Sequence, residues 1–366
     1  MTAISIDRRA SAGGAPAPRR PAARTSRRTT WAHVALLAGG VALAVWRFAD
    51  AQPALKPYTL VLDFVPTGEY VPHYTALEKG WYREEGLDVK IVRGQGSADT
   101  VKRIAAGQGD VGIADISTVI AARANTDAKV KAIALWYRRP PHGIFVRADS
   151  PIKSPKELAG KKLAISPGNS HQILWPIFEK LSGLAPSSVT WVTMDAASMP
   201  PALINGQTDA VPFFVVHEAR IRKVAKQSNQ DIRVLVAWAD LGLDLSSTSL
   251  VARDESIARE PEPLKAFLRA TLRGADYAFR QKNFDEGVKY VVKHHPEVDP
   301  DGALGAAQVA SRFVYAEEVV KGTVAVGQFE PARLEKTRDT YTEYLGLKRK
   351  VPLEEIYTND LLPAKK

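Results

Sequence analysis

The 366-residue chain contains no cysteine, and this absence excludes several classes of protein. Without cysteine there can be no disulfide, no thiolate metal ligand, no cysteine nucleophile and no lipidated N-terminal cysteine. The histidines lack metal-binding spacing, since His294 and His295 are adjacent and would diverge on a helix. The sequence also has no phosphate-binding P-loop and no Gly-x-Ser-x-Gly nucleophile elbow. We therefore expect no metal, no cofactor and no catalytic residue.

The basic character of the chain comes mainly from its N-terminus. Residues 1–51 contribute +6 of the net charge of +10, with eight arginines against two aspartates. The other 315 residues carry 42 basic and 38 acidic side chains, which predicts a mixed surface rather than a basic stripe. A nucleic-acid partner is therefore not expected. The length is sufficient for two domains of ordinary size.

Residues 1–51 have the organisation of an export signal. A basic region precedes an apolar run of about 15 residues, shorter than the ~20 that a membrane-spanning helix needs. Ala49 and Ala51 frame an Ala-x-Ala cleavage site, so we expect cleavage after about Ala51 and a mature protein in the periplasm. The sequence SRRTTW at residues 26–31 resembles a twin-arginine signal. An uncleaved membrane anchor remains the alternative, and the export route stays open.

The mature chain alternates strand and helix patterns. Strands are expected at residues 58–64, 88–92 and 111–114, each followed by a helical pattern, and a second block repeats this order from near residue 154. Such alternation is typical of parallel βαβ units. The segment LINGQTDAV at residues 203–211 echoes IAAGQGDVG at residues 104–112, which indicates two lobes of similar construction.

Polar and aromatic residues gather where predicted strands lead into predicted helices. In a doubly wound sheet these positions share one edge and face a crevice that can hold a ligand. Several have a structural alternative: each Ser, Thr, Asn or Asp could cap a helix, and His217 and Glu218 could be solvated at a helix start. Trp136, Phe213 and Phe214 are favoured as core residues over ligand platforms. The candidate ligand-binding residues are Asp63, Phe64, Tyr70, Ser97, Asp115, Ser117, Thr118, Trp136, Asn169, Ser170, His171, His217 and Glu218.

Four motifs, in the order EKGWYREEGLDV, GQGDVGIAD, SPKELAGKKLAIS and NGQTDAV, carry a family resemblance. From about residue 58 to residue 347 the chain resembles the periplasmic substrate-binding proteins of ABC importers for nitrate, sulfonates, taurine and thiamine pyrimidines. Thiamine-pyrimidine synthases of eukaryotes belong to the same superfamily. The resemblance implies an α/β fold of the type II periplasmic binding protein class, with two doubly wound lobes and a ligand crevice between them.

The resemblance also implies where the lobes divide. Lobe 1 would comprise residues 52–147 and 250–366, the latter including the C-terminal helices, and lobe 2 would comprise residues 148–249. Crossing segments near Phe145 and Val146, and near residues 247–250, would act as hinges.

The implied function is capture of a small solute for delivery to an ABC permease in the inner membrane, by a protein expected to be monomeric. The carboxylates of Asp63, Asp115 and Glu218 favour a pyrimidine-like or amine-bearing solute over a bare anion, because they repel anions and accept from ring amines. Sulfonate, taurine, nitrate and aromatic acids stay open, since helix N-termini could hold their oxygens.

An enzyme of the synthase branch is the main alternative. That enzyme uses pyridoxal phosphate on a lysine and consumes one of its own histidines, and by the resemblance these two residues fall at Ala114 and Thr118. Alanine has no amine with which to form an aldimine, and the cysteine-rich segment of the synthases has no counterpart. A binding protein rather than an enzyme is therefore predicted. The effector domain of a transcriptional regulator ranks last, because residues 1–51 hold a leader rather than a helix-turn-helix.

Overall fold

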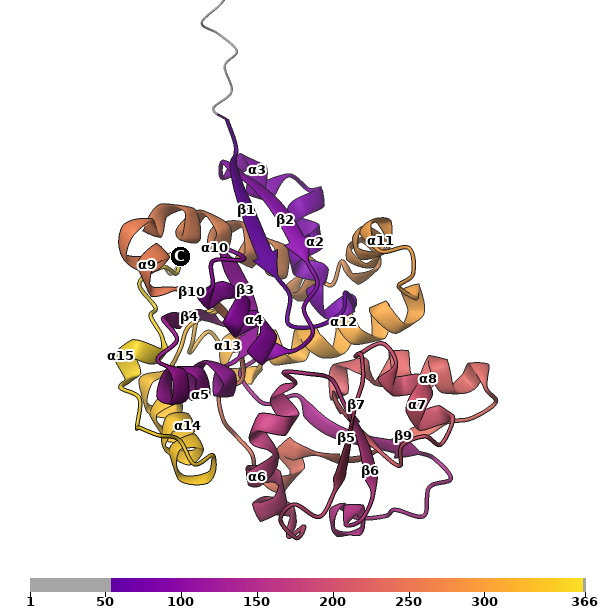
Figure 1. Ribbon diagram of the computed structural model, residues 1–366. Helices are drawn as coiled ribbons and strands as arrows, with labels where there is room; N and C mark the ends of the chain where they lie inside the picture. The colour runs from indigo at the N-terminus through magenta and orange to yellow at the C-terminus, as the bar shows by residue number, and fades with distance from the viewer. Residues whose placement is uncertain (1–53, 365–366) are drawn as a thin grey trace, which may run out of the picture. The chain divides into compact units, whose positions relative to one another are not determined.

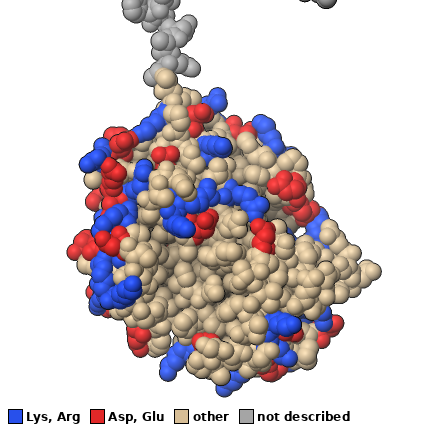
Figure 2. Space-filling view, viewed as in Figure 1, with Lys and Arg blue, Asp and Glu red and all other residues tan. Residues whose placement is uncertain are grey.

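The computed structural model describes residues 54–364, which contain one five-stranded sheet, a three-stranded and a two-stranded sheet that a single bridge joins into a second layer, and their helices (Figure 1). The predicted export signal lies outside the described residues. Within residues 54–364, every helix is too short or too polar to span a lipid bilayer. Figure 2 shows Lys, Arg, Asp and Glu side chains interspersed on one face, with a broad uncharged area below them.

The first sheet has the order β2-β1-β3-β10-β4. β1 pairs in parallel with β2 and β3, whereas β10 runs antiparallel to both β3 and β4. The predicted parallel βαβ units are therefore completed by one strand that returns from much later in the chain. The strands are β1 (Lys56–Val61), β2 (Leu87–Val92), β3 (Val111–Asp115), β4 (Val130–Leu135) and β10 (Thr248–Arg253).

The second sheet repeats this order. β5 pairs antiparallel with β8 and β9, β6 pairs in parallel with β7, and a bridge between Leu163 and Ala210 joins β6 to β8. The resulting order β7-β6-β8-β5-β9 places one antiparallel strand next to last, as in the first sheet. The strands are β5 (His142–Arg147), β6 (Lys162–Ile165), β7 (Thr190–Thr193), β8 (Val211–Phe214) and β9 (Ile232–Ala237).

The two echoing segments noted in the sequence occupy equivalent places. In each segment a helix is followed by a glycine with positive φ, Gly107 at 73° and Gly206 at 70°. The chain then enters β3 in the first sheet and β8 in the second. The Asp110 carboxylate accepts the N–H of Thr59 at 2.7 Å, and the Asp209 carboxylate accepts the N–H of Lys162 at 2.8 Å. The sequence echo therefore arises because the same turn fastens equivalent strands, β1 in the first sheet and β6 in the second.

Helices cover both faces of the first sheet, because successive side chains of a strand point to opposite sides. Leu60 packs in a core cluster with Phe267 of α10, whereas Val61 packs in a second cluster with Ile104 of α4. The predicted α/β class is confirmed. The helices up to β9 are α2 (Val71–Glu78), α3 (Trp81–Glu84), α4 (Ser97–Ala105), α5 (Ile116–Thr126), α6 (Ser170–Ser182), α7 (Met199–Ile204) and α8 (Glu218–Gln227).

The helices after β10 return to the first sheet, and one of them also contacts the second. α12 packs on the short helix η1 (Gly68–Tyr70) and on α8. A Cβ on Gly68 would overlap the Ala303 carbonyl at 1.7 Å, so only glycine permits this approach. These helices are α9 (Asp254–Arg259), α10 (Pro261–Ala275), α11 (Phe284–His294), α12 (Pro300–Val314), α13 (Glu317–Val320), α14 (Pro331–Tyr344) and α15 (Leu353–Ile356).

Shorter turns of helix connect the main elements. Three of them are 3-10 helices and one has π geometry. They are η2 (Pro155–Leu158), η3 (Val215–His217), η4 (Trp238–Leu241) and η5 (Asp276–Arg280), of which η5 is the π-helix.

The chain crosses between the sheets earlier than the sequence predicts. Phe145 and Val146, expected in a crossing segment, lie inside β5 and pair with β9, and Phe145 also pairs with β8. The second sheet thus begins at His142 rather than at residue 148. The crossings are residues 136–141 and 242–247, and the apolar run after His142 forms a buried strand of the second sheet. We call the first sheet with its helices lobe 1, and the second sheet with α6, α7 and α8 lobe 2.

Candidate ligand-binding site between the two sheets

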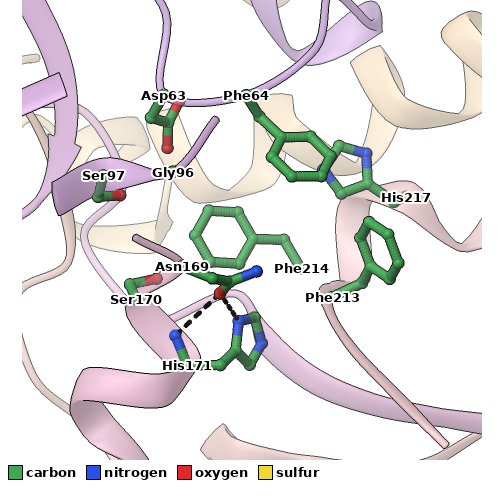
Figure 3. A pocket seen from close by; sticks show the side chains of 10 residues that line it. All are labelled: Asp63, Phe64, Gly96, Ser97, Asn169, Ser170, His171, Phe213, Phe214 and His217. Carbon is green, nitrogen blue, oxygen red and sulfur yellow. Dashed lines mark hydrogen bonds between the residues drawn. The ribbon is translucent and has the colours of Figure 1, made fainter. Parts of the chain in front are cut away.

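A pocket lies where strand ends and helix starts of both lobes meet, and it encloses about 320 Å³ between protein atoms, including the space at its mouth (Figure 3). Lobe 1 contributes the segment after β1 and the start of α4. Lobe 2 contributes the start of α6, the end of β8 and η3. The lining residues are Asp63, Phe64, Gly96, Ser97, Asn169, Ser170, His171, Phe213, Phe214 and His217.

Two helix N-termini reach the pocket. Asn169 caps α6, since its Oδ1 accepts the backbone N–H of His171 at 3.0 Å and lies 2.9 Å from the Nδ1 of the same residue. Gly96 precedes α4 and meets lobe 2 directly, because its Cβ position is 2.5 Å from the Gly168 carbonyl carbon and oxygen. The N–H of Ala98 donates to that same carbonyl at 3.0 Å. Backbone from the two lobes is therefore in contact at the rim of the pocket.

Asp63 is the acidic group of the pocket wall. Its side chain is buried, and the hydroxyl of Tyr70 donates to its Oδ1 at 2.9 Å. Burial raises the pKa of Asp63 to about 7, against the opposing effect of the Tyr70 hydrogen bond. Near neutral pH this carboxyl group can therefore accept hydrogen bonds as a carboxylate or donate one as an acid.

A second buried acid, Glu69, lies behind the pocket and holds His217. The hydroxyl of Tyr137 donates to Glu69 Oε2 at 3.1 Å, and Glu69 Oε1 lies 3.3 Å from His217 Nε2. Burial raises the pKa of Glu69 to about 8 and lowers that of His217 to about 3, so the imidazole is neutral. His217 Nδ1 is buried without a hydrogen-bond partner among the described residues. The protonation of Glu69 decides whether that nitrogen donates or accepts.

Aromatic rings form the rest of the wall. Phe64 meets Phe213 edge-on, with ring centroids 5.7 Å apart, and lies 5.3 Å from the ring of His217. Phe214 lies 5.6 Å from the ring of His171. Figure 3 shows these rings facing the polar side chains of Asp63 and Ser97. An arrangement of flat apolar walls with a few directed polar groups suits a small flat ligand.

Sequence comparison assigns the family of this chain. Residues 67–283 match the family described as NMT1/THI5 like, which is more than half of the chain. The chain belongs to the NMT1/THI5-like family. The predicted resemblance is thereby confirmed.

Two bacterial relatives are solute-binding proteins by name. The NMT1/THI5-like chain is 25% identical over 326 residues to the riboflavin-binding protein RibY of Chloroflexus aurantiacus, covering 86% of this chain and 88% of the relative. It is 27% identical over 255 residues to the formylaminopyrimidine-binding protein of Halalkalibacterium halodurans, covering 69% and 74%. A 4-amino-5-hydroxymethyl-2-methylpyrimidine phosphate synthase of Schizosaccharomyces pombe is 26% identical, covering 58% of this chain and 62% of that enzyme.

Solved structures agree on the fold. The alkanesulfonate-binding protein SsuA from Xanthomonas axonopodis pv. citri, bound to MOPS, superposes with a TM-score of 0.61 at 19% identity, covering 84% of this chain and 99% of that chain. The periplasmic nitrate-binding protein NrtA from Synechocystis PCC 6803 gives a TM-score of 0.56 at 15% identity, covering 82% and 91%. The NMT1/THI5-like chain therefore has the periplasmic binding protein fold that the sequence predicts.

The structure brings about half of the predicted site residues to the pocket. Two further residues, Phe213 and Phe214, were expected in the core and are both buried and part of the pocket wall. The supporting residues Glu69 and Tyr137 were not among the candidates. The predicted residues that line the pocket are Asp63, Phe64, Ser97, Asn169, Ser170, His171 and His217.

Asp115, Ser117 and Thr118 do not line the pocket. The Asp115 carboxylate caps α5 by accepting the N–H of Ser117 at 2.9 Å, and it also accepts the hydroxyls of Ser117 and Ser247, each at 2.5 Å. Thr118 donates its hydroxyl to the Asp115 carbonyl at 2.7 Å. Asp115 thus has the helix-capping role that the sequence left open as the alternative to ligand contact.

Three other predicted residues also lie away from the pocket wall. Tyr70 supports Asp63 from behind, and Trp136 is buried with its ring 4.9 Å from that of His73. The Glu218 side chain is 41% exposed and pairs with Arg222 at 2.8 Å, so it is the solvated residue at a helix start. Among the described residues, no group of three or more His, Asp or Glu side chains could hold a metal ion.

Proposed function

We propose that the protein is the solute-binding component of an ABC importer and captures a small, flat, amine-bearing solute between its two lobes. The observation that carries this proposal is the pocket itself, in which groups from both lobes surround one space with aromatic walls and a single carboxyl group. A ligand that touches both lobes stabilises their closed arrangement, so the ligand-bound protein differs in conformation from the free protein.

A single-ring nitrogen heterocycle is the favoured solute class. Riboflavin and formylaminopyrimidine, named for two of the relatives, are both nitrogen heteroaromatic compounds. Only about 20 Å³ of the pocket admits the centre of a water-sized sphere, far below the ~300–1,000 Å³ typical of ligand sites, so the lobes must separate to admit a solute and one ring is favoured over a flavin. Asp63 accepts well from ring amines, and the rings of Phe64 and Phe214 suit stacking.

The alternative of a pyridoxal-phosphate-dependent synthase is weaker on this site. None of the ten lining residues is a lysine. Ala114 is fully buried within β3, and its methyl group cannot form an aldimine. The bacterial relatives that are binding proteins also match more of this chain than the synthase does.

Location and partner follow from the same proposal. We place the mature protein in the periplasm, after cleavage of the signal near Ala51, as a monomer that delivers its solute to an inner-membrane permease. The two lobes would approach each other by rotation about the crossings at residues 136–141 and 242–247.

A ligand panel tests the proposed function. Thermal unfolding would be followed with 4-aminopyrimidine, riboflavin, an alkanesulfonate, taurine, nitrate and pyridoxal phosphate. A solute at about one hundred times its dissociation constant adds roughly 2.7 kcal/mol to the free energy of unfolding and raises the midpoint by several degrees. Stabilisation by the aminopyrimidine without turnover supports the proposal, and an aldimine absorbance band with pyridoxal phosphate contradicts it.

A further inference from the structure

A second cavity lies beside the ligand pocket and contains a cation that has no ion-pair partner among residues 54–364. It encloses about 1080 Å³ between protein atoms, including open solvent at its mouth. Val65 and Thr67 border it from lobe 1, Arg220 and Lys223 from α8, and Gly302 from α12. Phe64 and Val65 line different cavities although they are adjacent, and Arg220 follows the pocket residue His217 by three positions. Arg220 is also close enough to His217 for its charge to contribute, after burial, to lowering the pKa of that imidazole.

Arg220 differs from its charged neighbours in that its side chain pairs with no other residue that the structure describes. In the described part of the chain its side chain makes no ion pair and no hydrogen bond, and its Nη1 atom is buried. Lys223, by contrast, pairs with Asp299 and Asp301, and Arg222 pairs with Glu218 and Asp231. Burial lowers the pKa of the Arg220 guanidinium, while the buried Glu69 acts in the opposite direction through space. The Arg220 charge is thus poorly compensated within the protein.

The backbone at Arg220 is held in place by close packing between α8 and α12, although the arginine charge is poorly compensated. α12 packs against α8 through two glycines: a Cβ on Gly302 would lie 3.2 Å from the Arg220 Cα, and a Cβ on Gly305 would lie 2.5 Å from the Ala219 Cβ. A larger residue at either position would push α8 away. An arginine that is fixed in place, half-buried and unpaired is arranged to receive an external anion, since a guanidinium binds carboxylate or phosphate oxygens in a two-pronged geometry.

We propose that Arg220 forms an anion subsite, which binds a carboxylate or phosphate group carried by the solute whose ring occupies the first pocket. This inference rests on the proposed function and refines the solute class to an anionic heterocycle. It favours the anionic solutes that the sequence left open over the neutral amine-bearing ring that the carboxylates of Asp63, Asp115 and Glu218 favoured. A free inorganic oxyanion from the periplasm is the other source of the same chemistry, and the experiment separates the two.

Calorimetric titration of the protein with three probes tests the subsite. The probes are 4-aminopyrimidine, 4-aminopyrimidine-5-carboxylate and inorganic phosphate. We expect the wild-type protein to bind the carboxylate about tenfold or more tightly than the unsubstituted ring, as a charge-assisted hydrogen bond implies. Arg220→Gln should remove this preference, and Arg220→Lys should keep part of it because the charge remains. Arg222→Gln is the matched control on the same helix and should retain the full preference.

Each outcome bears on one of the two proposals. Equal affinity for both ring compounds in the wild-type protein, or an unchanged preference in Arg220→Gln, refutes the subsite but leaves solute capture intact. Binding of phosphate alone, lost in Arg220→Gln, supports the subsite with a free anion as its ligand and refutes the heterocyclic solute. No binding of any probe refutes the subsite, while the wider ligand panel still tests the proposed function. If Arg220→Gln fails to fold, the preference for the carboxylate is compared between Arg220→Lys and Arg222→Gln. A weaker preference in Arg220→Lys supports the subsite, and an equal preference in the two variants refutes it.

Discussion

Replacing Asp63 with asparagine should make the protein more stable and at the same time weaken its ligand binding. Asp63 is buried, and burial raises its pKa from 3.8 to about 7. Between these two values the folded chain binds a proton that the unfolded chain has released, so the free energy of unfolding falls as the pH rises through this window and is constant above it. The carboxyl group therefore destabilises the fold most at pH 8.

The size of the effect follows from the shift in pKa. A rise from 3.8 to about 7 is roughly three pH units, and each unit corresponds to 1.36 kcal/mol, which gives on the order of 4 kcal/mol at pH 8. Asparagine has a similar shape, cannot ionise and can still accept the Tyr70 hydroxyl. Asp63→Asn should accordingly raise the unfolding midpoint by several degrees at pH 8 and have little effect at pH 4.

Ligand binding should change in the opposite direction. Loss of the carboxylate removes the charge-assisted acceptor for a ring amine, so we expect the affinity for 4-aminopyrimidine to fall about tenfold or more. Thermal unfolding at pH 4 and pH 8, with and without this ligand, measures both effects. Asp88→Asn is the control, because the Asp88 side chain is 60% exposed and its replacement should change stability by less than about 0.5 kcal/mol. A lower midpoint of Asp63→Asn at pH 8 would show that Asp63 is a satisfied carboxylate and that the reasoning is wrong.

Three further predictions use other parts of the site. Affinity of the wild-type protein for 4-aminopyrimidine should rise as the pH passes upward through about 7, where Asp63 loses its proton, and titration of Asp63→Asn should show no such step. Asp115→Ala should lower the free energy of unfolding by about 1–3 kcal/mol, because it removes a helix cap and leaves the Ser247 hydroxyl without its acceptor. The ligand affinity of this variant should stay within about twofold of the wild-type value. A tenfold loss of affinity would show that Asp115 contacts the ligand after all. Gly96→Ala places a Cβ 2.5 Å from Gly168, so stopped-flow measurements should show ligand dissociating about tenfold faster, and an unchanged rate would mean that this contact is absent in the loaded state.

The fold could be predicted from the sequence because its determinants are local. Strand and helix periods and glycine stops all depend on residues within one short segment. Helix starts have local signals for the same reason, and Ser97, Asn169 and Ser170 do lie at the starts of α4 and α6 beside the pocket. The position of the crossing near Phe145 was missed, since a buried strand and a buried connection have similar apolar sequences.

The candidate site could be predicted only in part, because its chemistry depends on residues distant in sequence. An aspartate at a helix start can cap the helix or face a ligand, and for Asp115 the decision rests on Ser247, more than one hundred positions later. The pairing of Glu69 with His217 joins the two lobes in the same way. Nothing in the sequence around Arg220 indicates that it lacks a partner, since Arg222 two positions away has two.

The contact between Gly96 and Gly168 makes the way in which the two lobes meet independent of the choice of solute. In the proposed closure the lobes meet at this rim through main chain alone, so the contact at this point does not depend on the side chains that select the solute. Under the proposed function, substitutions at Phe214 or Arg220 should therefore alter the solute while leaving this backbone contact unchanged. A permease that recognises the closed lobes would not have to contact the solute itself. One permease could therefore accept variants of this protein that bind different solutes.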